Sequence, residues 1–283
     1  MRPFGAVFAC TGQELPACKS NLVLVMLNPT AGIDVGSLST DVVIAEKRRV
    51  LGYAIVPTLA HGGDAAASAF DSALLSAGLS RDAVGAIVST GYGRGSVEFA
   101  SRTVTEITCH AVGARVLFPQ AAMVIDIGGQ DSKVIRLGPD GRVEDFVMND
   151  KCAAGTGRFL EVMAQALDVP LECTGEMALG SSTELTISST CTVFAESEVV
   201  ALAASGAARE DVLAAINRSV VDRILGMVSR IHGVPPPVMT GGVAKNSGIV
   251  REIESRLGTR ALIPDEPQIV GALGAAIIAG EAV

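Results

Sequence analysis

Two stretches of the sequence repeat one another and carry the same types of side chain at the same spacing. GIDVGSLSTDVVI (32–44) aligns without a gap with VIDIGGQDSKVIR (124–136), so that Asp34 falls on Asp126, 126 − 34 = 92 residues later. Each copy has the pattern of a β-hairpin whose turn is Asp-x-Gly followed by small and hydroxyl residues. Such a turn brings backbone N–H groups and hydroxyls close to an anion, and the aspartate can hold Mg²⁺, usually through water. Two of these turns facing each other would clamp a polyphosphate.

A third stretch, VMTGGVAKNSGI (238–249), has the pattern of a strand, a Gly-Gly break and a helix. Glycines at such a break allow the backbone to approach the base and ribose of a nucleotide closely. Taken alone, the same pattern is that of an ordinary strand-to-helix connection. The presence of the two repeated turns favours the nucleotide interpretation.

Two of the six cysteines stand at matching positions in the chain. Cys152 and Cys191, 191 − 152 = 39 residues apart, each directly precede a helix-forming stretch. The N–H groups and dipole of a helix N-terminus favour negative charge, so they would stabilise thiolates and an anionic cluster bound to them. A single cysteine at such a place is more often a small buried residue. Because iron–sulfur clusters commonly take four thiolates, two per chain predict a [4Fe–4S] cluster shared across the axis of a homodimer.

The composition excludes several classes of protein. The net charge is −8 and no stretch concentrates Lys and Arg, which argues against a nucleic-acid-binding surface. The mean hydropathy is high, at +0.44, but the apolar runs 22–27 and 271–280 are much shorter than the roughly 20 residues that a membrane span needs. We therefore expect a soluble, cytoplasmic protein. No chemistry is assigned to the remaining cysteines, Cys10, Cys18, Cys109 and Cys173.

The elements that must carry these residues alternate between strands and helices, which indicates α/β layers. Beyond the two hairpins, we expect strands at 84–89, 237–240 and 261–263, and helices at 64–77, 97–115, 157–168, 193–205, 209–232, 246–257 and 268–280. The repeat predicts two lobes. Residues 1–29 have no assignment; 30–118 form lobe I with the first phosphate loop and the C-terminal helix 268–283; 119–267 form lobe II with the second phosphate loop, the two cysteines and the third motif.

The order and spacing of these motifs resemble the actin/hexokinase/Hsp70 class of ATPases, with a duplicated ribonuclease-H-like fold. GIDVGSLST resembles the first phosphate loop, VIDIGGQDS the second, VMTGGVAKN the adenosine motif and PQIVGALGAAIIAG (267–280) the closing helix. This class binds ATP or ADP with Mg²⁺ between two lobes.

Roles for single residues follow from the chemistry of the turns. Asp34 and Asp126 are expected to organise metal-bound water and phosphate. Gln130 is a candidate for orienting the attacking water, and the alternative, an exposed turn residue, stays open. The phosphates are expected to contact Gly36, Ser37, Ser39, Thr40, Gly128 and Gly129, and the adenosine to contact Gly241, Gly242 and Asn246.

The cysteine-bearing motifs MNDKCAAGTGRFLEVMA and ISSTCTVFAESEV, with TGYGRGSVEFA and EITCHAVGA, resemble the BadF/BadG/BcrA/BcrD ATPase family and, within it, the activators of 2-hydroxyacyl-CoA dehydratases. The resemblance implies that Cys152 and Cys191 ligate the cluster. It also implies that ferredoxin or flavodoxin supplies an electron, which ATP hydrolysis drives into a partner dehydratase or a related acyl-CoA reductase. The sequence departs from the family at Asp41, where relatives often carry Lys.

Two other functions are compatible with parts of the sequence. One is the ATP-binding subunit of a benzoyl-CoA reductase-type enzyme, although GGQDSK and NDKCAAGTGRF are more similar to the separate activators. The other is a small-molecule kinase of the same fold, which would need a cleft for an acceptor hydroxyl and would have no use for the two thiols. A chaperone or filament protein is a weaker alternative, because the sequence has no substrate-binding module or long insertions.

Overall fold

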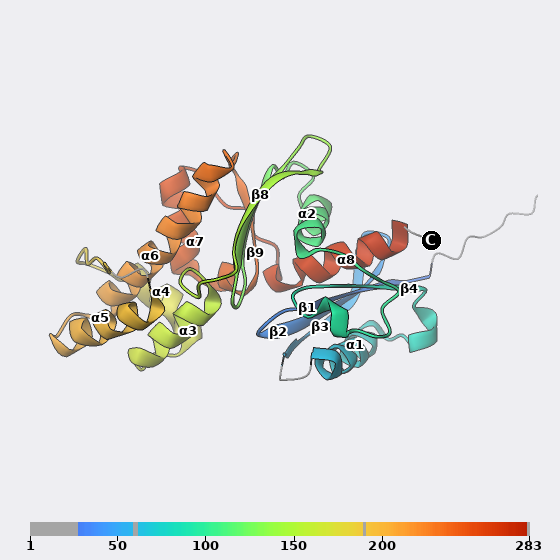
Figure 1. Ribbon diagram of the computed structural model, residues 1–283, viewed down its shortest axis with the longest axis horizontal. Coiled ribbons are helices and arrows are strands. Elements are labelled where there is room, and N and C mark those ends of the chain that lie inside the picture. Colours follow the sequence, from blue (N-terminus) through green and yellow to red (C-terminus); the bar gives the residue numbers. More distant parts are fainter. Residues whose placement is uncertain (1–27, 59–61, 189–190, 282–283) are drawn as a thin grey trace, which may run out of the picture.

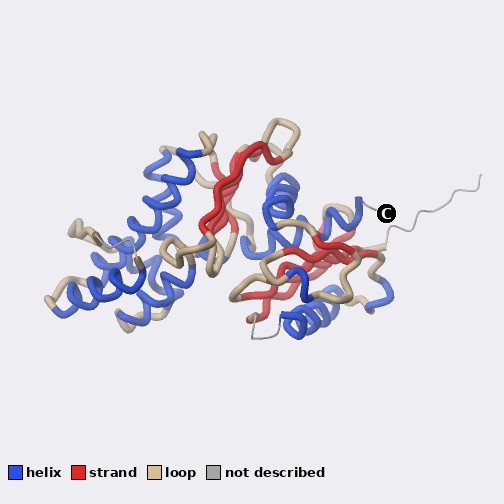
Figure 2. The backbone as a smooth tube through the Cα atoms, in the orientation of Figure 1, coloured by secondary structure: helices blue, strands red, loops and turns tan. Residues whose placement is uncertain are grey.

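The computed structural model describes residues 28–58, 62–188 and 191–281. The unassigned segment 1–29 therefore lies almost wholly outside the described residues, together with Cys10 and Cys18. Figure 1 shows two α/β parts side by side, each built around one of the two repeated hairpins. The strands of the two parts form separate sheets, which Figure 2 shows in red.

The first sheet contains the first hairpin and has the strand order β3-β2-β1-β4-β5. Its strands are β1 (Thr30–Val35), β2 (Ser39–Glu46), β3 (Arg49–Pro57), β4 (Ala86–Thr90) and β5 (Arg102–Thr103). Every residue of β1 is buried, because α1 (Gly62–Ala77) packs on one face of the sheet and α8 (Val270–Glu281) on the other. A strand covered on both faces is apolar throughout, which explains why its sequence does not alternate.

The second sheet repeats the arrangement of the first. Its strands are β6 (Met123–Ile127), β7 (Ser132–Leu137), β8 (Val143–Asn149) and β9 (Pro237–Thr240), in the order β8-β7-β6-β9. In both sheets the first three strands form an antiparallel meander, and the fourth joins the first strand in parallel. The two predicted hairpins are therefore confirmed, and the duplication extends to four strands of each sheet.

Helices of the second part share one apolar core with its sheet. They are α3 (Gly157–Ala166), α4 (Thr174–Leu179), α5 (Thr192–Ala204), α6 (Arg209–Arg230) and α7 (Ser247–Leu257). All except α4 match predicted helices to within two residues at each end. Helix α4 is a single short helix after a 3₁₀ turn, too short to give a periodic pattern in the sequence.

Helix α2 (Glu106–Leu117) lies between α8 and the second sheet and contacts both (Figure 1). The predicted start at 97 is wrong: Thr105 ends the preceding extended segment, and its hydroxyl accepts a hydrogen bond from the N–H of Thr108 at 3.4 Å, which caps the helix. Gly274 of α8 lies directly against the backbone of Cys109 and Gly113, where a Cβ would collide. This contact brings α2 close to the first sheet.

The predicted strand 261–263 is reduced to an isolated bridge between Leu262 and Val238. Among the described residues, no helix combines the length and the apolar character needed to cross a membrane.

Candidate functional site

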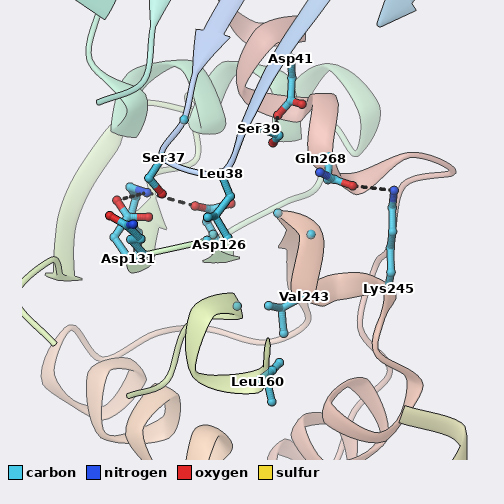
Figure 3. A pocket seen from close by; sticks show the side chains of 18 of the residues that line it. Ser37, Leu38, Ser39, Asp41, Asp126, Asp131, Leu160, Val243, Lys245 and Gln268 are labelled. Atoms are coloured by element: carbon cyan, nitrogen blue, oxygen red, sulfur yellow. Dashed lines mark hydrogen bonds and ion pairs between the residues drawn. The ribbon is translucent and has the colours of Figure 1, made fainter. Parts of the chain in front are cut away.

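A pocket of about 720 Å³ lies between the two hairpin turns, a volume that suits a nucleotide (Figure 3). Its lining includes, of the residues singled out in the sequence, Asp34, Gly36, Ser37, Ser39, Asp126, Gly128, Gly129, Gln130, Gly241, Gly242 and Asn246. Thr40 is not among the lining residues. Its side chain is buried in β2 and its hydroxyl shares a hydrogen bond of 2.7 Å with that of Thr58.

Asp126, at the end of β6, is held by groups from three elements. Thr240 of β9 donates a hydrogen bond of 2.8 Å to Oδ1, Lys133 of β7 donates one of 3.2 Å to Oδ2, and Nδ1 of His110 lies 3.5 Å from Oδ1. Burial by itself would raise the pKa of Asp126, but His110, Lys133 and Thr240 together hold that pKa below its ordinary value. Asp126 is therefore an ionised, oriented carboxylate at the pocket wall.

Asp34, the equivalent residue of the first hairpin, has a different environment. The pKa of its buried carboxyl is raised well above the ordinary value, first by burial and then by the neighbouring carboxylate of Asp41. Nε2 of His110 lies 4.0 Å from Oδ2 of Asp34, beyond hydrogen-bond distance. His110 thus stands between the two aspartates, with one ring nitrogen toward each.

Lys133 is almost completely buried and lies among three carboxylates. Its Nζ is 2.7 Å from Asp131, 2.9 Å from Glu106 and 3.2 Å from Asp126. Burial would lower the pKa of Lys133, but the three carboxylates raise it above the ordinary value, so the ammonium stays charged. Because Glu106 begins α2, this cluster also ties α2 to the second hairpin.

Sequence reasoning identified neither His110 nor Lys133 as a site residue. A signal was present for each. His110 lies four residues after Glu106, so the two share one face of α2, and Lys133 follows Asp126 by seven residues within the repeated hairpin.

Asp41 is the third aspartate of the pocket and is buried, with 7% of its surface exposed. Its Oδ2 accepts a hydrogen bond of 3.2 Å from Ser39, whereas its Oδ1 is buried and has no hydrogen-bond partner. Burial, as the main cause, raises the pKa of Asp41 to about 7; Ser39 opposes the shift and Glu266 adds to it. In Figure 3, Asp41 and Ser39 lie together, apart from Asp126 and Asp131.

The Gly-Gly break after β9 forms another wall of the pocket. Gly241 has a φ of 82°, and a Cβ there would collide with the carbonyl of Ile127, so this turn requires glycine. Lys245 binds Glu266 at 2.8 Å and Gln268 at 2.7 Å, which connects the break to the start of α8. Asn246 lines the pocket and also caps α7 by accepting a hydrogen bond of 3.0 Å from Ile249.

Cys152 and Cys191 are not among the residues that line the pocket; they precede α3 and α5, two helices that contact each other. Cys191 is exposed and is the N-cap residue of α5, as predicted. Cys152 differs: it is half-buried in a turn five residues before α3, whose N-cap is Thr156. Asn149 fixes this turn by donating hydrogen bonds to the carbonyls of Cys152 and Ala154. Within the described residues, no group of three or more His, Cys, Asp or Glu side chains forms a metal site.

Comparison with known proteins agrees with this geometry. The model of the BadF/BadG/BcrA/BcrD ATPase family matches residues 31–279. The chain is 44% identical over 253 residues to the activator of lactoyl-CoA dehydratase of Anaerotignum propionicum, covering 89% of this chain and 98% of that protein. It is 41% identical over 251 residues to the (R)-2-hydroxyglutaryl-CoA dehydratase activating ATPase of Acidaminococcus fermentans, covering 88% and 96%.

Solved structures support the same assignment. The activator of the 2-hydroxyisocaproyl-CoA dehydratase from Clostridium difficile, with bound ADPNP, matches with a TM-score of 0.86 and 41% identity, covering 90% of this chain and 95% of that one. A ROK family glucokinase from Streptomyces griseus matches with a TM-score of 0.56 and 16% identity, covering 89% and 99%, and shows the fold alone. The predicted two-lobed actin/hexokinase-type fold is confirmed, and the chain belongs to the BadF/BadG/BcrA/BcrD ATPase family.

Proposed function

We propose that this protein is an ATP-dependent one-electron donor that activates a 2-hydroxyacyl-CoA dehydratase. In this proposal a homodimer holds one [4Fe–4S] cluster, which accepts an electron from ferredoxin or flavodoxin. Hydrolysis of ATP to ADP and phosphate drives transfer of that electron to the dehydratase. The observation that carries the proposal is the exposed thiol of Cys191 at the N-cap of α5, in a chain of this ATPase family.

The donor set suits an iron–sulfur cluster rather than a closed structural metal site. Thiolates are the ligands that iron–sulfur clusters prefer, and a helix N-terminus stabilises their negative charge. Cys191 is exposed and Cys152 is half-buried, so both residues are open to a group at the protein surface. Two such ligands per chain leave the cluster half-coordinated, which requires a second copy.

A second copy also has an apolar surface to cover. Val193 and Phe194, in the first turn of α5, are 61% and 67% exposed. They lie directly beside Cys191 in the sequence, so a dimer that shares a cluster at Cys191 would bury them. Large exposed apolar side chains next to a ligand position favour an interface there.

The hydrolysis site is expected to use the groups that surround the pocket. Asp126 and Asp34 would organise the Mg²⁺ and its water, while the turns at Gly36–Ser39 and Gly128–Gly129 would hold the phosphates. Gln130 lines the pocket and remains the candidate for orienting the attacking water. The related activator has bound ADPNP, which supports nucleotide binding by this chain.

A direct hydrogen-bonded path connects the nucleotide turn to the cysteine region. The N–H groups of Gly157 and Arg158, the first residues of α3, donate to the carbonyls of Gly128 and Gly129 at 2.8 Å each. A movement of the second phosphate turn would therefore move the N-terminus of α3, which follows the turn holding Cys152. Coupling requires that ATP and ADP differ in affinity for two such arrangements.

The test is the iron content of protein purified without oxygen. We expect about four irons per dimer and a brown colour in the wild type. Cys152→Ser and Cys191→Ser should each lose the iron and the visible absorbance and still bind ADP, because serine is similar in size to cysteine but lacks the soft thiolate. Each single variant should match the double variant, since two-fold symmetry removes two ligands at once.

Cys173→Ser is the matched control, because Cys173 is an exposed cysteine on another element and has no assigned role. It should retain the full complement of iron. Four irons per dimer in Cys152→Ser would contradict the cluster assignment. A colourless, iron-free wild type that transfers phosphate to a small acceptor would instead support the kinase alternative.

A further inference from the structure

The two repeated hairpins differ in one charge at the same position. In β1 and β2 the residue opposite Asp34 is Asp41, and in β6 and β7 the residue opposite Asp126 is Lys133. These pairs are equivalent in the repeat, since 133 − 41 = 92. The second hairpin therefore carries its own cation beside the phosphate turn, whereas the first carries a second carboxylate.

The lining of the whole pocket also carries more acidic than basic side chains. Five aspartates and three glutamates line it, against two lysines, and no arginine of the described chain is among the lining residues. Both lysines are already engaged: Lys133 with three carboxylates and Lys245 with Glu266. A bound nucleotide adds several negative charges of its own. A single Mg²⁺ organised by Asp34 and Asp126 leaves the carboxylate of Asp41 without a cation of its own.

Asp41 offers a second carboxylate in the first hairpin, beside Asp34. Its Oδ1 is buried at the pocket wall without a partner, and Ser39 holds Oδ2. Leaving a buried carboxylate oxygen unpartnered is unfavourable unless a ligand completes it. Mg²⁺ is commonly bound by one or two carboxylates together with substrate phosphates and water, rather than by a cage made of protein alone. Asp41, a carboxylate among the residues that line the pocket, meets this description.

We propose that Asp41 binds a second divalent cation, which enters with the nucleotide and lies between the first hairpin and the phosphates. The ion takes the place in the first hairpin that the ammonium of Lys133 occupies in the second. The inference rests on the nucleotide site of the proposed function and is independent of the iron–sulfur cluster. It predicts that this protein needs more Mg²⁺ than the formation of MgATP requires.

The experiment counts bound divalent ions with Mn²⁺ as the probe. Free Mn²⁺ is measured from its room-temperature EPR signal, with and without saturating ADPNP, in wild type, Asp41→Asn and Asp41→Lys. We expect two nucleotide-dependent Mn²⁺ ions per chain in the wild type and one in either variant. Asp41→Lys supplies a positive charge in place of the second ion. Over the range of free Mg²⁺ in which the second site fills, the affinity of this variant for ADPNP should therefore change about tenfold less than that of the wild type.

Asp150→Asn is the matched control, because it removes another carboxylate that lines the same pocket and lies outside the hairpin pair. It should still bind two ions. Asp41→Asn has nearly the shape of the wild-type side chain, so its ion count remains informative if the lysine variant does not fold.

One nucleotide-dependent Mn²⁺ in the wild type would overturn the second site, as would two in both Asp41 variants. Dependence of ADPNP affinity on K⁺ with a single Mn²⁺ bound would likewise overturn the divalent assignment. If ADPNP does not bind to the wild type under any of these conditions, the proposed nucleotide site itself fails, which is a distinct result.

Discussion

At the scale of single residues, charge and burial determine the pKa of the pocket aspartates more than the sequence motifs in which they occur. Asp34 and Asp126 are equivalent in the repeat, yet the pKa of the first is raised by burial and by Asp41, whereas Lys133 and His110 overcome burial and lower that of the second. The pocket is thus lined by one carboxyl group whose pKa is raised and one whose pKa is lowered. The pocket is therefore an asymmetric site built from a symmetric pair of hairpins.

The stability of the nucleotide-free protein should fall as pH rises, because of Asp41. The pKa of Asp41 is about 7 in the folded state and 3.8 in the unfolded state, so between these values the folded state binds more protons and loses stability as pH increases. From pH 5 to pH 7 the loss from this group is on the order of 3 kcal/mol, and above pH 7 it levels off. Asp41→Asn should remove this slope.

The measurement is urea unfolding of both proteins at pH 5 and pH 8, without nucleotide or added divalent ions. The variant should gain stability relative to the wild type as pH increases, with most of the gain complete by pH 7.5. Parallel pH curves for the two proteins would show that the Asp41 carboxyl is not perturbed.

At the scale of elements, α3 is the connection between the nucleotide turn and the cysteines. The N–H groups of Gly157 and Arg158 donate hydrogen bonds to the second phosphate turn. The buried side chains of α3 belong to the main core of the second part. A helix held in this way moves as a unit, because interior packing resists local deformation. The hydrogen bonds at its first turn are therefore the place to test the proposed coupling.

Arg158→Pro should uncouple hydrolysis from the cluster. Proline in the first turn of a helix is tolerated, since the N–H it lacks has no partner within the helix, but here that N–H binds Gly129. We expect ATP hydrolysis to persist and the difference between the cluster EPR spectra with ADP and ADPNP to shrink at least severalfold. Arg158→Ala is the control: it loses the ion pair with Glu161, keeps the N–H, and should retain the spectral difference. Equal behaviour of the two variants would contradict the proposed path.

At the scale of the whole molecule, the two parts present different surfaces. The pocket lies between the two hairpin turns, whereas α5, whose first turn exposes Val193 and Phe194, lies at the far end of the second part (Figure 1). The proposed dimer surface on α5 and the pocket are therefore separate regions. This separation allows each to be disrupted without the other.

Under the proposed function, Phe194→Glu should convert the dimer to a monomer and remove the iron. Phe194 is 67% exposed in the single chain, so the substitution should change the stability of the chain by less than about 0.5 kcal/mol, while a charge in a buried interface is strongly unfavourable. Light scattering after anaerobic gel filtration gives the mass, and the same fractions give the iron. Leu75→Glu, at an 85% exposed position on α1, is the control and should remain a dimer. An unchanged mass for Phe194→Glu would exclude this surface as the interface.

The sequence by itself determined the local patterns: both hairpins, the Gly-Gly break after β9, the N-cap at Cys191 and most helices. Each depends on residues close together in the chain, whose spacing and conformational preferences are visible without the fold. Errors arose where a local pattern was too weak or was interrupted. Thr105 caps α2 later than predicted, and a turn separates Cys152 from α3.

Only the tertiary structure decided the electrostatics of the site. His110 meets both aspartates because α2 lies between the two sheets, and Lys133 meets Glu106 for the same reason. The lack of a hydrogen-bond partner for Oδ1 of Asp41 likewise depends on how the surrounding elements pack. These interactions join residues far apart in the chain. The strength of each depends on burial, which is known only once the fold is known.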